Sequence, residues 1–199
     1  MAGRRKPGLW VMEGSWSASV RDVRSVDPVL SALQDNRRAH HAKRHINDPD
    51  DLAQSLKQWG QKQHSGFNIG YVALHGSPGA VHIGRRTVDL HQLGGQLPKA
   101  ALAKKALHFG SCSVLDLDQP EQQELRKALG VNALTGFTKD IDWFEGLAFE
   151  LLLFEALTWY ARPSDAEKYL KRTHAAFAER LGFVMVRSQA PTASTTENF

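Results

Sequence analysis

A single cysteine and a histidine that precedes a glycine are the two residues of this sequence best suited to covalent chemistry. Cys112 is the only cysteine among the 199 residues, so the chain cannot form an internal disulfide. A lone cysteine is either a small buried hydrophobic residue or a nucleophile. His75 is one of nine histidines, and it stands out because a nearly continuous apolar run, Phe67 to Leu74, leads directly into it.

Together these two residues could catalyse acyl transfer. A free cysteine thiol has a pKa of about 8.5 and is mostly protonated at neutral pH. An imidazole beside the thiol can take its proton, and it can later protonate a leaving amine. The backbone N–H groups of Gly76 and Cys112 would supply the hydrogen-bond donors that a tetrahedral oxyanion needs.

Each of the two residues follows a short apolar segment that has the pattern of a buried parallel strand. Phe67 to Leu74 precedes His75, and Ala106 to Phe109 leads through Gly110-Ser111 into Cys112. In open α/β sheets, functional groups gather at the carboxyl ends of parallel strands. If the two strands are neighbours in the sheet, the imidazole and the thiol face one crevice.

The elements that would position them alternate between strand-like and helix-like patterns, which predicts a three-layer α/β/α sandwich with a mostly parallel central sheet of about six strands. The predicted strands are Gly8 to Gly14, Ala39 to Ile46, Phe67 to Leu74, Ala106 to Phe109, Ala133 to Phe137 and Phe183 to Val186. The predicted helices are Val26 to Leu33, Asp48 to Trp59, Gln119 to Leu129, Trp143 to Tyr160 and Ala166 to Leu181.

Two details of the helices can be predicted. Asp27, followed by Pro28, has the residue types of an N-cap and first helical position. The helix from Trp143 to Tyr160 is apolar on most faces, so we expect it to be largely buried.

The length and composition are those of one globular domain, with 42% hydrophobic and 23% charged residues. We expect a flexible basic extension over residues 1–8, the domain over residues 9–188 and a disordered tail over residues 189–199. No apolar run approaches the roughly 20 residues that span a bilayer, and no signal peptide is evident. These features predict a cytoplasmic protein with no membrane partner.

The charge is mildly basic, with a net value of +4. A basic stretch from Arg37 to Arg44, with His40, His41 and His45 around it, could bind nucleic acid or an acidic partner. No nucleic-acid-binding motif accompanies it, so a solvated surface is favoured. A metal site at these histidines is not favoured either, because no further ligands stand at zinc spacing.

The segments around His75 and Cys112 resemble those of the caspase-like cysteine peptidases. The matching residues are Tyr71-Val-Ala-Leu-His-Gly76 and Leu107-His-Phe-Gly-Ser-Cys-Ser113. Downstream, Gly130 to Asp142 is similar to the segment that follows the catalytic strand in the CHAT and separase-like members. There a glycine-containing strand leads through an acidic turn into a long apolar helix.

The resemblance implies a caspase-like peptidase domain with a Cys-His dyad, in which Cys112 is the nucleophile, His75 the general base and acid, and Gly76 an oxyanion donor. It also implies that an acidic residue lines the S1 pocket and receives a basic P1 side chain. Asp140 and Asp142 stand in the matching stretch, and Asp116 is a further candidate. Asp140 and Asp142 could equally cap the helix that follows.

By the same resemblance, the protein would need no organic cofactor and no metal. Its partners would be a protein or peptide substrate and an activator or regulatory protein, and a role in prokaryotic defence or programmed cell death follows by analogy. The alternative is a catalytically inactive caspase-like module that serves as a scaffold. Labelling of Cys112 by an electrophilic peptide would distinguish the two.

Overall fold

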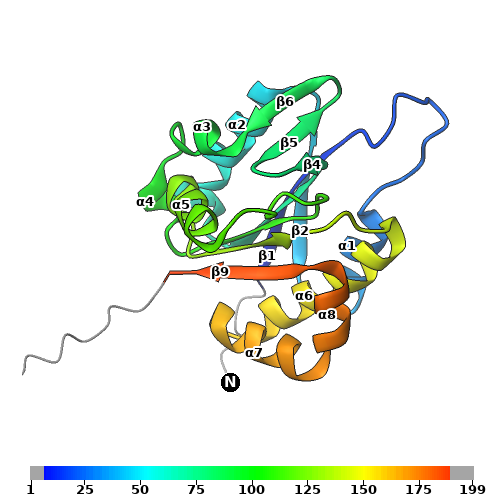
Figure 1. Cartoon of the computed structure of the whole chain (residues 1–199), viewed down its shortest axis with the longest axis vertical. Helices are drawn as coiled ribbons and strands as arrows, with labels where there is room; N and C mark the ends of the chain where they lie inside the picture. The colour runs from blue at the N-terminus through cyan, green and yellow to red at the C-terminus, as the bar shows by residue number, and fades with distance from the viewer. Residues whose placement is uncertain (1–6, 189–199) are drawn as a thin grey trace, which may run out of the picture.

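The computed structural model describes residues 7–188, and its centre is a six-stranded sheet (Figure 1). The order across the sheet is β2-β1-β3-β7-β8-β9, in which the first five strands are parallel and β9 runs antiparallel to β8. The strands are β1 (Gly8–Gly14), β2 (His40–Ile46), β3 (Phe67–Ala73), β7 (Ala106–Phe109), β8 (Ala133–Phe137) and β9 (Phe183–Arg187).

A small antiparallel sheet follows β3 directly. It contains β4 (His75–Ser77), β5 (Ala80–Ile83) and β6 (Arg86–Asp89) in that order. The turn between β4 and β5 includes Gly79, whose positive φ of 70° suits a glycine. His75 therefore lies where the chain passes from the main sheet into this hairpin.

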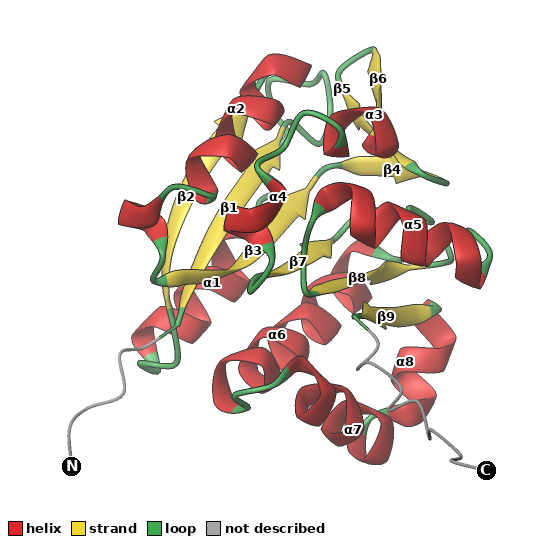
Figure 2. Cartoon of the chain, turned by 90° about the vertical axis from the view of Figure 1, so that its left-hand side faces the viewer, coloured by secondary structure: helices red, strands yellow, loops and turns green. Residues whose placement is uncertain are grey.

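Helices cover both faces of the main sheet, which makes the fold a three-layer sandwich (Figure 2). The helices are α1 (Asp27–Asp35), α2 (Pro49–Trp59), the 3-10 turn η1 (Lys62–His64), α3 (Leu90–Gly94), α4 (Lys99–Leu102), α5 (Gln119–Leu129), α6 (Trp143–Trp159), α7 (Pro163–Thr173) and α8 (Ala175–Leu181). One layer is formed by α2 to α5, and the other by α1 and α6 to α8. Within residues 7–188, no helix is long and apolar enough to cross a membrane.

The side chains of β1 show why both faces need a helical layer. Trp10 and Met12 belong to the core on the α2–α5 side, whereas Leu9 and Val11 belong to the core on the α1 and α6 side. Successive side chains point to opposite faces of a strand. A strand with apolar side chains on both of its faces is therefore buried on both sides, as parallel sheets of this kind are.

Two predictions about the helices, an N-cap and an uninterrupted length, were wrong. Asp27 is the first residue of α1, and Val26 is its N-cap, without a side-chain capping bond. The Asp27 carboxylate instead accepts a hydrogen bond of 2.6 Å from Lys43. The helix predicted over Ala166 to Leu181 is divided into α7 and α8, because the backbone at His174 leaves the helical conformation.

The long helix α6 is less buried than its composition suggested. Its sheet-facing stripe is buried, but Phe144 is 77% exposed and Trp159 is 59% exposed. The apolar surface of α6 is wider than the sheet can cover. The expected tail, residues 189–199, and the expected extension, apart from Pro7 and Gly8, lie outside the described residues.

Candidate active site

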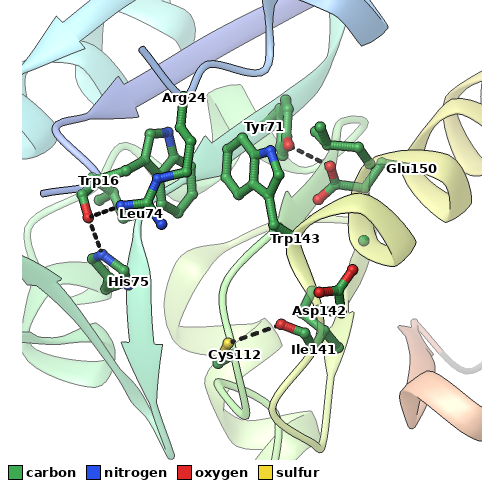
Figure 3. Close-up of a pocket in the computed structure, with 13 residues that line it drawn as sticks. Trp16, Arg24, Tyr71, Leu74, His75, Cys112, Ile141, Asp142, Trp143 and Glu150 are labelled. Atoms are coloured by element: carbon green, nitrogen blue, oxygen red, sulfur yellow. Dashed lines mark hydrogen bonds between the residues drawn. The ribbon is translucent and has the colours of Figure 1, made fainter. Parts of the chain in front are cut away.

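A cavity of about 260 Å³ lies at the carboxyl ends of the central parallel strands (Figure 3). The loops that leave β1, β3, β7 and β8 and the start of α6 surround it. Its walls are formed by Trp16, Arg24, Tyr71, Leu74, His75, Gly110, Cys112, Ile141, Asp142, Trp143, Gly146, Leu147 and Glu150. Functional groups are expected at this edge of an open α/β sheet.

His75 and Cys112 both line this cavity because their strands are neighbours. β3 pairs directly with β7, and Val72 lies opposite Phe109 at the end of the pairing. The residues that follow also approach closely: a Cβ atom on Gly76 would lie 2.8 Å from the carbonyl oxygen of Cys112. Glycine at this position lets the two loops meet.

The turn that holds Cys112 is anchored to the loop after β8. Ser113 has a positive φ of 46°, and its N–H donates to the carbonyl of Lys139 over 2.9 Å. The Ser113 hydroxyl donates to Asp140 Oδ1 over 3.1 Å. The Cys112 thiol points toward the carbonyl of Ile141, with an Sγ-to-oxygen distance of 3.9 Å.

The backbone at Cys112 leaves a donor available. Within residues 7–188, the Cys112 N–H has no hydrogen-bond partner. A free N–H beside a thiol is the arrangement that an oxyanion hole requires.

His75 is held by a backbone carbonyl on the opposite wall. Its Nε2 atom lies 2.8 Å from the carbonyl oxygen of Trp16. A carbonyl oxygen can only accept, so Nε2 carries the hydrogen and the lone pair of the neutral ring is on Nδ1. The Trp16 ring also packs edge-to-face on the His75 ring, with centroids 5.4 Å apart. The imidazole is thus fixed in both tautomer and orientation.

We call residues 15–25, between β1 and α1, the Trp16 strap. The Trp16 indole packs against Trp143 at the start of α6, with ring centroids 4.6 Å apart. Arg24 Nη2 donates to the Trp16 carbonyl over 3.2 Å, and the Arg24 guanidinium also pairs with Asp22. The hydrogen bond from Arg24 lowers the pKa of the Asp22 carboxyl below its usual value.

A buried acid, Glu150 of α6, forms the deep wall of the cavity. The Tyr71 hydroxyl donates to Glu150 Oε2 over 2.5 Å, and His108 Nε2 lies 3.2 Å from Oε1. The second ring nitrogen of His108 pairs with Thr135, so His108 is a buried structural residue. Burial, together with the Glu150 charge, raises the pKa of Tyr71 well above its usual value.

The three acidic residues considered for the S1 pocket occupy different places. Asp142 lines the cavity and also caps α6, since its Oδ1 accepts from the N–H groups of Phe144 and Glu145. Asp140 is exposed and bonds Ser113, while Asp116 is exposed beyond the turn that follows Cys112, and neither lines the cavity. Only Asp142 of the three lines the cavity that contains the candidate nucleophile.

The residue patterns did not identify most of the cavity wall. Trp16, Arg24, Tyr71, Trp143 and Glu150 were not among the candidate site residues. A signal existed for Glu150, because a carboxylate in the middle of an apolar helix is rarely buried without a partner. No local pattern indicated Trp16, which reaches the site from the loop that follows β1.

The described residues include no group of three or more His, Cys, Asp or Glu side chains that could hold a metal ion. His41 and His45, on β2 at the edge of the main sheet, therefore belong to no such group among the described residues.

Comparison with solved structures shows the class of fold. The chain is similar to a secreted C11 cysteine protease from Bacteroides thetaiotaomicron, whose crystal structure was determined in complex with an irreversible peptide inhibitor. The two share 12% sequence identity and superpose with a TM-score of 0.55 over 89% of this chain. The match covers 60% of the protease, so this chain spans less than two thirds of that length. The predicted caspase-like α/β/α sandwich is confirmed.

The family is shown by the sequence itself. Over residues 7–186 the chain matches the model of a family of unknown function, DUF6642, and it belongs to that family. No curated protein sequence matches it.

Proposed function

We propose that this protein is a cysteine endopeptidase in which Cys112 is the nucleophile and His75 the general base and acid. The observation that carries the proposal is that both side chains line one cavity while the Trp16 carbonyl leaves His75 Nδ1 free to accept a proton. The similarity in fold to a cysteine protease supports the same class of reaction.

The proposed reaction begins when the Cys112 thiol turns from the Ile141 carbonyl toward His75. Nδ1 takes the thiol proton, and the thiolate attacks the carbonyl carbon of the scissile peptide bond. The N–H groups of Gly76 and Cys112 stabilise the oxyanion. The C–N bond then breaks, His75 gives its proton to the leaving amine, and water hydrolyses the thioester to regenerate the thiol.

For the P1 residue we propose Arg or Lys. The cavity beside Cys112 contains two carboxylates, Asp142 at its rim and Glu150 at its deep wall. Gly110 borders Glu150 so closely that a Cβ atom at this position would overlap Glu150 Oε1, so a larger residue there would displace the acid from the cavity wall. Among the described residues that line the cavity, Arg24 is the single lysine or arginine, and its charge is already paired with Asp22. An added guanidinium or ammonium group would therefore meet net negative charge.

The nearest relatives of the protein, its cellular location and its activation belong to the same proposal. We infer that the nearest members are the stand-alone CHAT and separase-like peptidases, that the protein acts in the cytoplasm, and that a partner protein activates it. A role in prokaryotic defence or programmed cell death remains an analogy with those members.

The dyad is tested by labelling Cys112 with an electrophilic peptide that ends in arginine. We expect the wild-type protein to be labelled at least about a hundredfold faster than His75→Ala, because the imidazole no longer activates the thiol. Circular dichroism verifies that the variant is folded. If the Cys112 thiol reacts no faster than free cysteine and His75→Ala changes nothing, the inactive scaffold module becomes the better description.

The P1 preference is tested separately with a peptide library in which only the P1 residue varies. We expect cleavage after Arg and Lys to dominate in the wild type, and Glu150→Gln to lose about tenfold or more of that preference because a partner charge is removed. Equal cleavage after acidic or apolar P1 residues would contradict this assignment while leaving the dyad intact.

A further inference from the structure

A buried carboxylate next to the site has no role in the reaction described above. Glu13, near the end of β1, is 5% exposed in a strand whose other side chains are apolar. A carboxylate in such a place is retained only if its oxygen atoms are fully paired. The partners of Glu13 therefore show what it holds in place.

Glu13 holds both ends of the Trp16 strap. Its Oε1 atom accepts from the Trp16 indole N–H over 3.0 Å and from the Val26 N–H over 2.8 Å. Its Oε2 atom accepts from the Ser25 hydroxyl over 2.9 Å and from Lys43 Nζ over 3.0 Å. One side chain thus fixes the first turn of the strap and its last residues.

Lys43 places a positive charge beside this carboxylate, with Nζ 3.0 Å from Glu13 Oε2. Burial works against the Lys43 charge, but hydrogen bonds to Asp27 and Glu13 outweigh it and raise the pKa of Lys43 above its usual value. Lys43 is on β2, so the strap is tied to the sheet as well as to the start of α1.

Trp16 connects Glu13 to His75, because its indole bonds to Glu13 and its backbone carbonyl bonds to His75. The Trp16 ring N–H donates to Glu13, and the Trp16 carbonyl accepts from His75 Nε2–H over 2.8 Å. Because Glu13 also accepts from the Ser25 hydroxyl and the Val26 N–H, it restrains the strap at both ends and so limits movement of the Trp16 backbone carbonyl.

We propose that Glu13 is a positioning residue that sets the tautomer and orientation of His75 through Trp16. The inference rests on the proposed catalytic role of His75, which it extends by one residue. Fixed hydrogen bonding of this kind strengthens the base and stabilises the imidazolium that forms when the thiol is deprotonated. Without it the thiolate would be less favoured.

The test uses Glu13→Gln and Trp16→Phe in the full chain. Glu13→Gln removes the negative charge and replaces one of the two acceptor oxygen atoms by an NH2 group. Trp16→Phe removes the indole N–H but keeps an aromatic ring and the backbone carbonyl. The matched control is Glu167→Gln, which removes a comparably buried carboxylate paired with Lys171 and Arg187 on α7 and β9, away from the cavity.

The first measurement is the rate of Cys112 alkylation by iodoacetamide as a function of pH. For both strap variants we expect a loss of about tenfold or more near neutral pH, because small displacements of a catalytic group are costly, and a shift of the profile to higher pH. The Glu167→Gln control should keep the wild-type profile. The alkylation profile also depends on the other titratable or charged groups around His75, and neither strap variant changes them. These groups are Asp22, Arg24, His82, Cys112, Asp142 and Glu150.

The second measurement is the tautomer of His75 from the nitrogen chemical shifts of its ring. We expect the Nε2–H form in the wild type and a mixture of forms in Glu13→Gln. If both the alkylation profile and the tautomer of the strap variants equal those of the wild type, the proposal is overturned, even if their stability falls. If His75→Ala leaves alkylation unchanged, the dyad fails, whereas a changed tautomer in Glu13→Gln would still show that Glu13 positions His75.

Discussion

At the scale of single residues, the two halves of the candidate site meet because glycine stands where the chains are closest. A Cβ atom on Gly76 would overlap the Val114 side chain and lie 2.8 Å from the Cys112 carbonyl oxygen and from Ser111 Cβ. A backbone carbonyl cannot rotate away as a flexible side chain can. The distance between the His75 loop and the Cys112 turn therefore depends on the absence of a side chain at position 76.

Gly76→Ala should both destabilise the fold and slow the reaction of Cys112. Overpacking of this kind costs about 1–3 kcal/mol, and relief of the overlap would move the Cys112 turn. Chemical denaturation and the alkylation rate measure the two effects. The control is Gly84→Ala, where φ is 58° but nothing lies within 4 Å of the new Cβ. This control should lose about 1 kcal/mol from backbone strain alone and keep the Cys112 rate. Wild-type stability and reactivity in Gly76→Ala would contradict the close approach.

At the scale of elements, the start of α6 performs two tasks with one side chain. Asp142 caps the helix through the N–H groups of Phe144 and Glu145, and it lines the cavity. The sequence left two explanations for this acid, helix capping and substrate binding. The structure shows the capping bonds, and the binding role is part of the proposal above.

Asp142→Asn and Asp142→Ala separate the two tasks. Asparagine is as good an N-cap as aspartate, whereas alanine costs about 1 kcal/mol. We expect Asp142→Asn to have the wild-type free energy of unfolding, and Asp142→Ala to have a value about 1 kcal/mol lower. Both variants should prefer an arginine-ended label less strongly than the wild type does.

Asp118→Ala is the control for this comparison. It removes the capping box of α5, outside the cavity, and should lower stability without changing the preference of the label. If Asp142→Asn retains the full preference for the arginine-ended label, Asp142 is a cap alone, and Glu150 is left as the acid that selects the P1 residue.

At the scale of the whole molecule, a buried lysine makes the stability of the fold depend on pH. Lys105 directly precedes β7 at the end of the strand opposite the cavity, and it is only 6% exposed. Its Nζ donates to the carbonyl of Phe67 over 2.9 Å and lies 4.9 Å from the centre of the Trp59 ring. Burial lowers the pKa of Lys105 to about 8.

The sign of the effect follows from proton binding. Between the folded pKa of about 8 and the unfolded value of about 10.4, the unfolded chain holds more protons on this group than the folded chain does. The Lys105 contribution to the free energy of unfolding therefore rises with pH across that range. Lys105→Met should flatten this rise, as measured by urea denaturation at about pH 8 and about pH 10. An unchanged pH dependence in the variant would show that the Lys105 pKa is not lowered.

Local patterns were sufficient to predict most of the elements of the main sheet and the strands that His75 and Cys112 follow. The apolar runs before His75 and Cys112 form β3 and β7, and α5 spans Gln119 to Leu129 as predicted, because caps and periodicity act over a few neighbouring residues. Since the carboxyl ends of parallel strands face one edge, the shared location of the two side chains could also be anticipated.

The tertiary structure alone decided which distant residues complete the cavity. Trp16 reaches His75 from 59 positions away, and Tyr71 meets Glu150 across 79 positions. Such pairings depend on how loops and helices pack around the sheet, and no short-range pattern encodes them. The amino-acid sequence thus determined the strands of the main sheet and the positions of His75 and Cys112 after two of them, while packing decided the tautomer of the histidine and brought Glu150 to the cavity.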